Sequence, residues 1–291
     1  MQVERANAKL NLLLSVEGKR PDGYHELVSV MQTVSLCDLV TIDYRPESFT
    51  KISLDVSGAA RLPGDCTNLA YRAAEAFLTA TGRRGEVILR LEKHIPMAAG
   101  LGGGSADAAA VLRGLNRLCG SPLSKEELCW LGRTLGADVP FCIVGGTSLA
   151  TGVGEKLSSI SPMPQCAIVV ACGGKGVSTK EAYAIIDEAK QKRQALPDAI
   201  AKAFEEKDLA AAFPCFYNDF ETVVEPLRPM VREIKTTMKE SGALFSMMSG
   251  SGPSVFGIFP DPKTADTCQA ALPQKGISAF VCHPTGAYSF D

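Results

Sequence analysis

A glycine-rich segment over residues 96–106 carries the strongest chemical signal in the sequence, with four glycines among the five residues 100–104. A strand predicted over 86–93 precedes it, and an alanine-rich helix predicted over 105–118 follows it. Glycine lets the backbone approach a ligand closely, and the first N–H groups of a helix are unpaired and carry about half a positive charge. The segment therefore predicts an anion site, most naturally for nucleotide phosphates, with a ligand-free flexible turn as the alternative. Its residues are Pro96, Met97, Ala98, Ala99, Gly100, Leu101, Gly102, Gly103, Gly104, Ser105 and Ala106.

A single carboxylate follows in a second motif. Asp138 lies in the run Gly-Ala-Asp-Val-Pro-Phe, between a helix predicted over 124–135 and an apolar strand predicted over 139–144. Its carboxylate could take part in chemistry, or it could bond its own backbone in a turn. The motif alone leaves both interpretations open.

A third motif, Ala-Lys-Leu-Asn-Leu over 8–12, places two polar residues in an apolar strand. Side chains alternate between the two faces of a strand, so Lys9 and Asn11 share one face. The two side chains could face solvent or could be presented together to a site.

Two turns contain further candidates. Tyr24 and His25 follow a turn-forming stretch over 18–23, where an aromatic ring and an imidazole stand side by side. The run Ser-Gly-Ser-Gly-Pro over 249–253 separates two apolar strands. It could be a simple hairpin turn, or a second loop that lies close to the first glycine-rich segment.

The remaining patterns alternate between strand and helix periods and predict an α+β fold. Glycines and prolines cluster between 150 and 165, so we expect two domains, 1–155 and 156–291. Predicted strands are 3–16, 27–44, 52–56, 86–93, 139–144, 148–150, 167–171, 244–248, 254–259 and 278–282. Predicted helices are 68–81, 105–118, 124–135, 179–193, 197–206, 226–241 and 262–271.

Composition excludes several classes of protein. Of the 291 residues, 46% are hydrophobic and 21% are charged, which is typical of a globular chain rather than a disordered one. The net charge of −2 offers no basic excess for nucleic acid, and no apolar run is long enough to cross a membrane. The ten scattered cysteines form no C-x-x-C pair, which favours reduced thiols in a cytoplasmic protein over disulfides or a metal site.

Together these motifs resemble those of the GHMP small-molecule kinases, the group named for galactokinase, homoserine kinase, mevalonate kinase and phosphomevalonate kinase. An N-terminal strand motif, a P-x-x-x-G-L-G-[GS]-[GS]-S phosphate loop and a C-terminal glycine turn occur in that order at 8–12, 96–106 and 248–256. The block Arg-Pro-Asp-Gly-Tyr-His-Glu-Leu over 20–27 makes the chain most similar to members that phosphorylate diphosphocytidyl-methylerythritol, since other members generally lack it. The residues Ala98-Ala99 depart from the group, where glycines are more frequent.

The resemblance implies a two-domain GHMP kinase fold with the active site in the cleft between the domains. It implies transfer of the ATP γ-phosphoryl group to the 2-hydroxyl of that substrate, in the non-mevalonate route to isoprenoid precursors. The implied cofactors are ATP and Mg²⁺, and the implied partner is a small molecule with a cytidine diphosphate group. Another small-molecule kinase of the group, acting on homoserine, mevalonate or a sugar, is the alternative.

The resemblance also implies catalytic roles. Asp138 would accept the proton of the substrate hydroxyl. Lys9 would lie beside it and offset the negative charge that develops on the transferred group. Asn11 would hydrogen-bond the methylerythritol end of the substrate.

Further residues are implied in binding. Tyr24 would stack on the cytosine, His25 would read its polar edge, and Tyr183 would supply a second aromatic ring. Asn68 and Lys93 would lie near the adenine of ATP. The Mg²⁺ ligand is not identified by the sequence, and we expect a monomer or a weak homodimer.

Overall fold

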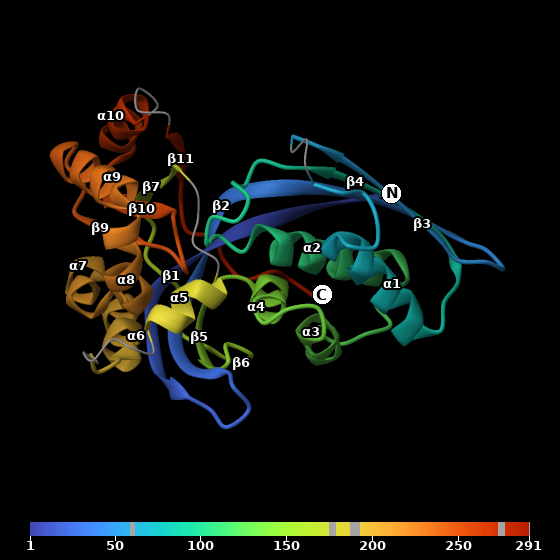
Figure 1. Ribbon diagram of the computed structural model, residues 1–291. Helices are drawn as coiled ribbons and strands as arrows, with labels where there is room; N and C mark the ends of the chain where they lie inside the picture. Colours follow the sequence, from blue (N-terminus) through green and yellow to red (C-terminus); the bar gives the residue numbers. More distant parts are fainter. Residues whose placement is uncertain (59–61, 175–178, 187–192, 273–276, 291) are drawn as a thin grey trace.

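The computed structural model describes residues 1–58, 62–174, 179–186, 193–272 and 277–290. Within them, two sheets and the helices packed on them form two lobes, and β1 and β2 run between these lobes (Figure 1). This mixture of helices and strands confirms the predicted α+β class.

The larger sheet has seven strands and lies mainly in the N-terminal lobe. Its main strand order is β3-β4-β2-β1-β8, and β5 pairs with β2 while β6 pairs with β5. Its strands are β1 (Gln2–Lys19), β2 (His25–Pro46), β3 (Lys51–Ser57), β4 (Gly85–Glu92), β5 (Thr147–Gly152), β6 (Lys156–Ser159) and β8 (Tyr217–Asn218).

Four helices of the N-terminal half share an apolar core with this sheet. They are α1 (Leu69–Thr81), α2 (Gly103–Leu118), α3 (Lys125–Arg133) and α4 (Val139–Val144). Every second residue of β4 is buried, and Val87, Leu89 and Leu91 fill that core, as expected for a strand with one buried face. Ser124 and Glu127 form a capping box that begins α3.

The second sheet is antiparallel, with strand order β11-β7-β10-β9. Apolar side chains of β1, such as Leu10 and Leu12, pack with Ile168 and Phe256 of this sheet, so one core joins the two sheets. The strands are β7 (Ala167–Cys172), β9 (Phe245–Met248), β10 (Val255–Phe259) and β11 (Ser278–Cys282). The helices of this half are α5 (Thr179–Ile186), α6 (Pro197–Glu205), α7 (Leu209–Ala212), α8 (Asp219–Leu227), α9 (Pro229–Glu240) and α10 (Pro262–Ala271), with a 3₁₀ turn at Phe213–Cys215.

The pairing of β1 with β2 is interrupted at three places, and two of these interruptions flank the polar motif. The register shifts between Asn7 and Lys9 and again between Asn11 and Leu13. Such irregularities turn the strand locally and re-aim its side chains. Lys9 and Asn11 lie between the two interruptions.

The strand predicted over 139–144 is wrong, because these residues form α4. A short apolar run cannot be assigned to a buried strand or a buried helix by periodicity alone. Pro140 stands in the first turn of α4, where its missing N–H costs no hydrogen bond. The helix is buried from Val139 to Ile143, which explains its continuous apolar character.

The helix predicted over 226–241 begins earlier and is divided. Asn218 caps α8, which runs to Leu227, and Pro229 starts α9. Of the helix predicted over 179–193, the structure confirms α5, and most of the remainder lies outside the described residues.

The predicted division between residues 155 and 156 falls between two paired strands, β5 and β6. Strand β8, from the second half, also extends the first sheet. Strands of the second half thus join the first sheet, and the division stays a prediction. None of the helices in the described part of the chain has the length and apolar character needed to span a bilayer.

Candidate active site

A cavity of about 810 Å³ lies where the motifs of the sequence meet. Residues of both halves line it, from β1 and the two residues just before α4 in the first and from α5 and α8 in the second. Of the predicted site residues it contains Lys9, Asn11, Tyr24, His25, Ala98, Gly100, Gly102, Ser105, Asp138 and Tyr183. We call it the acceptor cavity.

The polar centre of the acceptor cavity is Lys9, whose side chain is nearly buried at 7% exposure. Its Nζ donates to Asn11 Oδ1 at 2.6 Å and lies 3.5 Å from Asp138 Oδ2. The predicted common face of Lys9 and Asn11 is therefore confirmed, and it faces the cavity rather than solvent. The Asp138 side chain is 38% exposed, so its carboxylate is accessible from the cavity.

Asn11 is held by a chain of buried hydrogen bonds. Its Nδ2 donates to Ser29 Oγ at 2.8 Å, and that hydroxyl donates to the Leu13 carbonyl at 2.7 Å. The Asn11 backbone N–H also donates to Ser249 Oγ at 3.3 Å. These bonds orient the amide oxygen toward the Lys9 ammonium.

The glycine-rich segment wraps around Lys9 before it enters α2. The Lys9 backbone N–H donates to the Leu101 carbonyl at 2.9 Å. Gly102, with φ of 68°, caps α2, and a Cβ added there would stand 2.8 Å from Lys9 Cγ. Glycine at this position thus permits both the backbone turn and the close approach of the lysine.

The turn over 249–253 joins β9 and β10 as a hairpin and also touches the glycine-rich segment, so both predicted interpretations hold. Ser249 Oγ donates to the Gly100 carbonyl at 3.2 Å, and Asn218 Nδ2 donates to the Gly250 carbonyl at 2.8 Å. A Cβ on Gly250 would lie 2.8 Å from the Gly100 oxygen. The glycines allow two loops from different halves to come into backbone contact.

A second cavity of about 450 Å³ lies along the other side of the glycine-rich segment. Asn68 and Lys93 line it, together with every residue of the segment from Pro96 to Ser105. We call it the donor cavity. It shares Ala98, Gly100, Gly102 and Ser105 with the acceptor cavity, so the two meet at this loop.

Lys93 belongs to a buried ionic cluster at the donor cavity. Its Nζ bonds Asp38 Oδ2 and lies 2.7 Å from Asp107 Oδ2, while Asp38 Oδ1 accepts from the backbone N–H of Ile95 at 2.8 Å. Asp107 Oδ1 is buried without a hydrogen-bond partner. Burial raises the pKa of Asp107 to about 7; the Lys93 ammonium opposes this shift, and the Asp38 carboxylate adds to it.

An aromatic group forms another part of the acceptor cavity. The His25 ring stacks on Tyr183 with centroids 4.5 Å apart, and Phe220 meets Tyr183 edge-on at 4.9 Å. Tyr24 is 65% exposed beside them, and its backbone N–H is held by Asp22 Oδ1 at 3.1 Å. A base can stack on the Tyr183 face that His25 covers only if the imidazole moves, and the roles implied for these rings stay predictions.

The structure brings together residues that the sequence analysis did not select. Asp38 and Asp107 are charged positions inside an apolar strand and an alanine-rich helix, and such placement in the sequence was the available signal. Ser29 and Phe220 carry no comparable signal. Among the residues described, no group of three or more His, Cys, Asp or Glu side chains is placed to hold a metal ion.

Comparison with known proteins agrees with this geometry. Residues 68–146 match the family described as GHMP kinases N terminal domain, and residues 200–278 match GHMP kinases C terminal. The chain is 43% identical to 4-diphosphocytidyl-2-C-methyl-D-erythritol kinase of Lachnospira eligens, covering 94% of this chain and 93% of that protein. The chain belongs to this kinase family. It is also 45% identical to the Bacillus velezensis protein of the same name, covering 88% of this chain and 87% of that protein.

Solved structures place this member of the 4-diphosphocytidyl-2-C-methyl-D-erythritol kinase family among related folds. A crystal structure of a 4-(cytidine 5'-diphospho)-2C-methyl-D-erythritol kinase matches with a TM-score of 0.83 and 36% identity, covering 98% of this chain and all of that one. A homoserine kinase from Cytophaga hutchinsonii matches with a TM-score of 0.68 at 19% identity, with 99% of this chain and 97% of that one covered. This last likeness shows the fold alone. The predicted GHMP kinase fold is confirmed.

The backbone of Ala98 generates a first prediction. Its φ of 51° lies in the left-handed region, which costs an L-residue about 1–2 kcal/mol. We expect Ala98→Gly to raise the free energy of unfolding by about 0.5–1 kcal/mol, because this relief exceeds the entropy that glycine adds to the unfolded chain. Urea unfolding would measure it. Ala99→Gly is the matched control, because Ala99 is buried without a positive φ and this substitution should lower the free energy of unfolding. Equal changes in the free energy of unfolding for both variants would contradict the proposed strain at Ala98.

The raised pKa of Asp107 generates a second prediction. Between about pH 4 and pH 7 the unfolded carboxyl is ionised while the folded one still holds its proton, so rising pH favours unfolding. Relative to the wild type, Asp107→Asn should therefore gain at least about 1 kcal/mol of unfolding free energy between pH 5 and pH 8. Urea titrations at the two pH values would test this, with the exposed Asp55→Asn as control. A difference that stays constant with pH would refute it.

Proposed function

We propose that this protein is an ATP-dependent kinase that phosphorylates the 2-hydroxyl of 4-diphosphocytidyl-2-C-methyl-D-erythritol and releases ADP. The observation that carries the proposal is the Lys9–Asp138 pair beside the loop where the donor and acceptor cavities meet. Phosphoryl transfer needs its two substrates in line and its charge stabilised rather than much covalent chemistry. Two cavities that share one glycine-rich loop supply that arrangement. The reaction belongs to the non-mevalonate route to isoprenoid precursors.

In the proposed mechanism, Asp138 accepts the proton of the acceptor hydroxyl as the hydroxyl oxygen attacks the γ-phosphorus and the bond from that phosphorus to ADP breaks. Its exposed carboxylate faces the cavity that holds this hydroxyl. The Lys9 ammonium offsets the negative charge on the transferred group. The bond that Lys9 Nζ donates to Asn11 Oδ1 holds the ammonium near Asp138 and leaves it further protons to donate.

ATP would occupy the donor cavity, with its phosphates along the glycine-rich segment. The N-terminus of α2 offers backbone N–H groups and the positive end of the helix dipole to these phosphates. Asn68 and Lys93, which also line this cavity, would flank the adenine. Two protons of the Lys93 ammonium are engaged by Asp38 and Asp107, which leaves one for the nucleotide.

The cytidine end of the acceptor would lie at the aromatic group. Tyr24 would stack on the base, His25 would bond its polar edge, and Tyr183 would supply the second ring once the imidazole turns away from it. Asn11 would bond the methylerythritol end near Lys9. In this arrangement the 2-hydroxyl, rather than the cytidine, would lie at the Lys9–Asp138 pair.

Magnesium is expected with the nucleotide, because Mg²⁺ in kinases is held by one or two carboxylates together with phosphate oxygens and water. Ser105 lines both cavities at the phosphate loop and carries a hydroxyl oxygen, so it could hold such an ion together with phosphate oxygens and water. When bound, the ion would neutralise charge on the phosphates.

We further propose that the enzyme acts in the cytoplasm, as a monomer or weak homodimer with domains 1–155 and 156–291.

An assay of ADP release with Mg-ATP tests the proposed reaction. The acceptors compared would be diphosphocytidyl-methylerythritol, methylerythritol phosphate without the base, homoserine, mevalonate and galactose. Turnover with the cytidyl compound alone is the expected result. Turnover with another acceptor would support the proposed kinase reaction but reject the proposed cytosine-binding role of the aromatic group.

The role of Asp138 generates a third prediction. Asp138→Asn should lower kcat at least about 100-fold, since loss of a positioned base costs about 100- to 10,000-fold. Binding of ATP should change little, because Asp138 does not line the donor cavity. Steady-state kinetics and ATP titration would measure the two effects. A kcat equal to that of the wild type would show that Asp138 is not the base that accepts the hydroxyl proton.

The role of Tyr24 generates a fourth prediction. Tyr24→Ala should weaken binding of the cytidyl substrate by about 1–3 kcal/mol, the range for loss of one stacked base. Isothermal titration would measure the Kd. Phe49→Ala is a matched control, since Phe49 is also an exposed aromatic but lies outside the cavities. An unchanged Kd for Tyr24→Ala would count against stacking.

A further inference from the structure

The distance between Lys9 and Asp138 depends on how a strand and a helix lie against each other. Lys9 belongs to β1, whereas Asp138 stands at the start of α4, which ends at Val144. Residues 284–290, here called the C-terminal segment, contact both elements. The chain leaves the second lobe after β11 and returns to the first, where the C-terminal segment lies (Figure 1).

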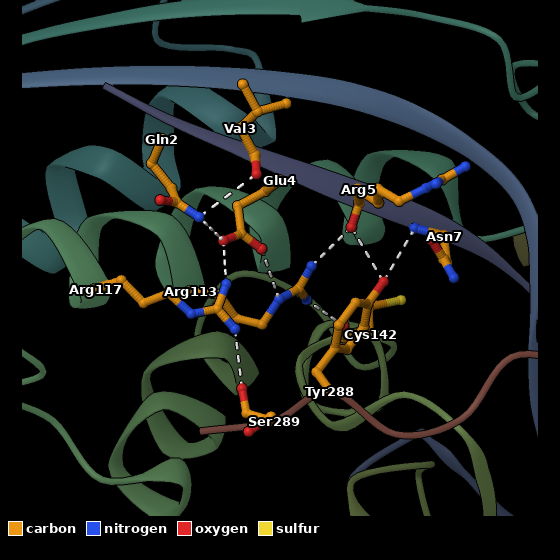
Figure 2. A network of polar contacts seen from close by, with 10 residues as sticks. All are labelled: Gln2, Val3, Glu4, Arg5, Asn7, Arg113, Arg117, Cys142, Tyr288 and Ser289. Carbon is orange, nitrogen blue, oxygen red and sulfur yellow. Dashed lines mark hydrogen bonds and ion pairs between the residues drawn. The ribbon is translucent and has the colours of Figure 1, made fainter. Parts of the chain in front are cut away.

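Arg113, in the middle of α2, joins β1 to α4. The residue is only 2% exposed. Its Nη1 donates to the Cys142 carbonyl of α4 at 2.7 Å, its Nη2 donates to the Arg5 carbonyl of β1 at 2.9 Å, and its Nε lies 3.4 Å from Glu4 Oε2 (Figure 2). Since a buried charge must keep its hydrogen-bond partners, the guanidinium ties the helix to the strand.

Tyr288 of the C-terminal segment completes this connection. Its ring lies against the guanidinium of Arg113, 3.6 Å from Cζ to the ring centroid (Figure 2). Its hydroxyl donates to the Arg5 carbonyl at 3.1 Å, and its backbone N–H donates to the carbonyl of Val144, the last residue of α4, at 2.9 Å. One residue near the chain end therefore contacts both elements and the arginine between them.

A second set of bonds joins the same elements through β2. Thr33 is the register partner of Lys9 and is completely buried. It exchanges hydrogen bonds with Gly146, just after α4: the Thr33 N–H donates to the Gly146 carbonyl at 3.0 Å, and the Gly146 N–H donates to Thr33 Oγ1 at 2.8 Å. The N–H of Thr285 donates to the Thr33 carbonyl at 2.9 Å. The C-terminal segment thus supports the strand interruption beside Lys9.

We propose that the C-terminal segment, through the stacking of Tyr288 on Arg113, is a positioning element that sets the distance between the Lys9 ammonium and the Asp138 carboxylate. Arg113 and Tyr288 lie outside both cavities, so they act through the pair and not on the substrates. The inference rests on the roles proposed for Lys9 and Asp138. Phosphoryl transfer depends mainly on positioning, and a displacement of about 1 Å can lower a rate about 100-fold.

The charge balance explains why the ring matters. Glu4, 4% exposed, pairs with Arg113 and also with Arg117, so one carboxylate serves two guanidinium groups. A planar guanidinium forms hydrogen bonds at its edge, and an aromatic ring stabilises its face. Without the Tyr288 ring, that face of Arg113 would be open to water, and α4 would lose a contact at its far end.

The test compares substitutions of Tyr288 in the full-length protein. Tyr288→Ala should lower kcat about 10- to 100-fold while the Kd for ATP changes less than about threefold, since the donor cavity is untouched. Tyr288→Phe keeps the ring over Arg113 and should retain most of the turnover. If Tyr288→Ala does not fold, Tyr288→Leu takes its place, because leucine keeps apolar bulk but offers no aromatic face.

A matched control separates positioning from loss of stability. Tyr44 is also half-buried against the N-terminal core, and its hydroxyl donates to the Arg84 carbonyl at 2.9 Å. It lies on the part of β2 that pairs with β4, away from α4. Tyr44→Ala should lower the melting temperature and leave kcat near that of the wild type.

A double-mutant cycle with Asp138→Asn decides the inference. If Tyr288 acts through Asp138, Tyr288→Ala should lower kcat less than about twofold in the Asp138→Asn background, because residues that act as a unit are not additive. The same fold-loss in both backgrounds, or no loss from Tyr288→Ala in the wild type, would overturn the inference and leave the proposed function standing. Wild-type turnover of Asp138→Asn would instead reject the proposed role of Asp138, and the inference with it.

Discussion

The buried ammonium of Lys9 is the constraint on which the site depends. A charged group taken out of water must be paired and hydrogen-bonded, or it destabilises the fold. Here the partners are Asn11, two residues along the same strand, and Asp138, from a helix more than a hundred residues later. Satisfying one charge therefore brings together a strand, a phosphate-type loop and a helix start. The same contacts that stabilise Lys9 produce a cation and an exposed carboxylate at the junction of two cavities.

Glycine makes this convergence sterically possible at two places. At Gly102 the chain passes against the Lys9 side chain, and at Gly100 it meets the turn from the second half. Ala98, three residues into the same segment, adopts a left-handed conformation without being glycine. At Gly100 and Gly102 the loop has no room for a Cβ, whereas at Ala98 it carries a Cβ in a backbone conformation that is unfavourable for alanine. Contacts with neighbouring residues, rather than the backbone preference of each residue, therefore set the shape of the loop.

The parts of the site that could be predicted from the sequence are those encoded locally. Period-two alternation placed Lys9 and Asn11 on one face, and the glycine-rich run before a helix indicated a phosphate loop. Long-range features could not be derived in this way: the pairing of Lys93 with Asp38 and Asp107 joins a loop, a strand and a helix. The run over 139–144 was assigned to a strand because a short buried apolar stretch has no distinguishing period.

The contacts of residues 284–290 with β1 affect the order of folding during synthesis. These residues bond to β1 and to the end of α4, so the N-terminal lobe reaches its final set of contacts only after residue 290 has left the ribosome. Although domains generally fold as units and N-terminal ones first, this lobe must wait for the rest of the chain. A nascent chain that stops before residue 284 would leave the end of α4 without the bond to Tyr288, and its Lys9–Asp138 pair would lack this support.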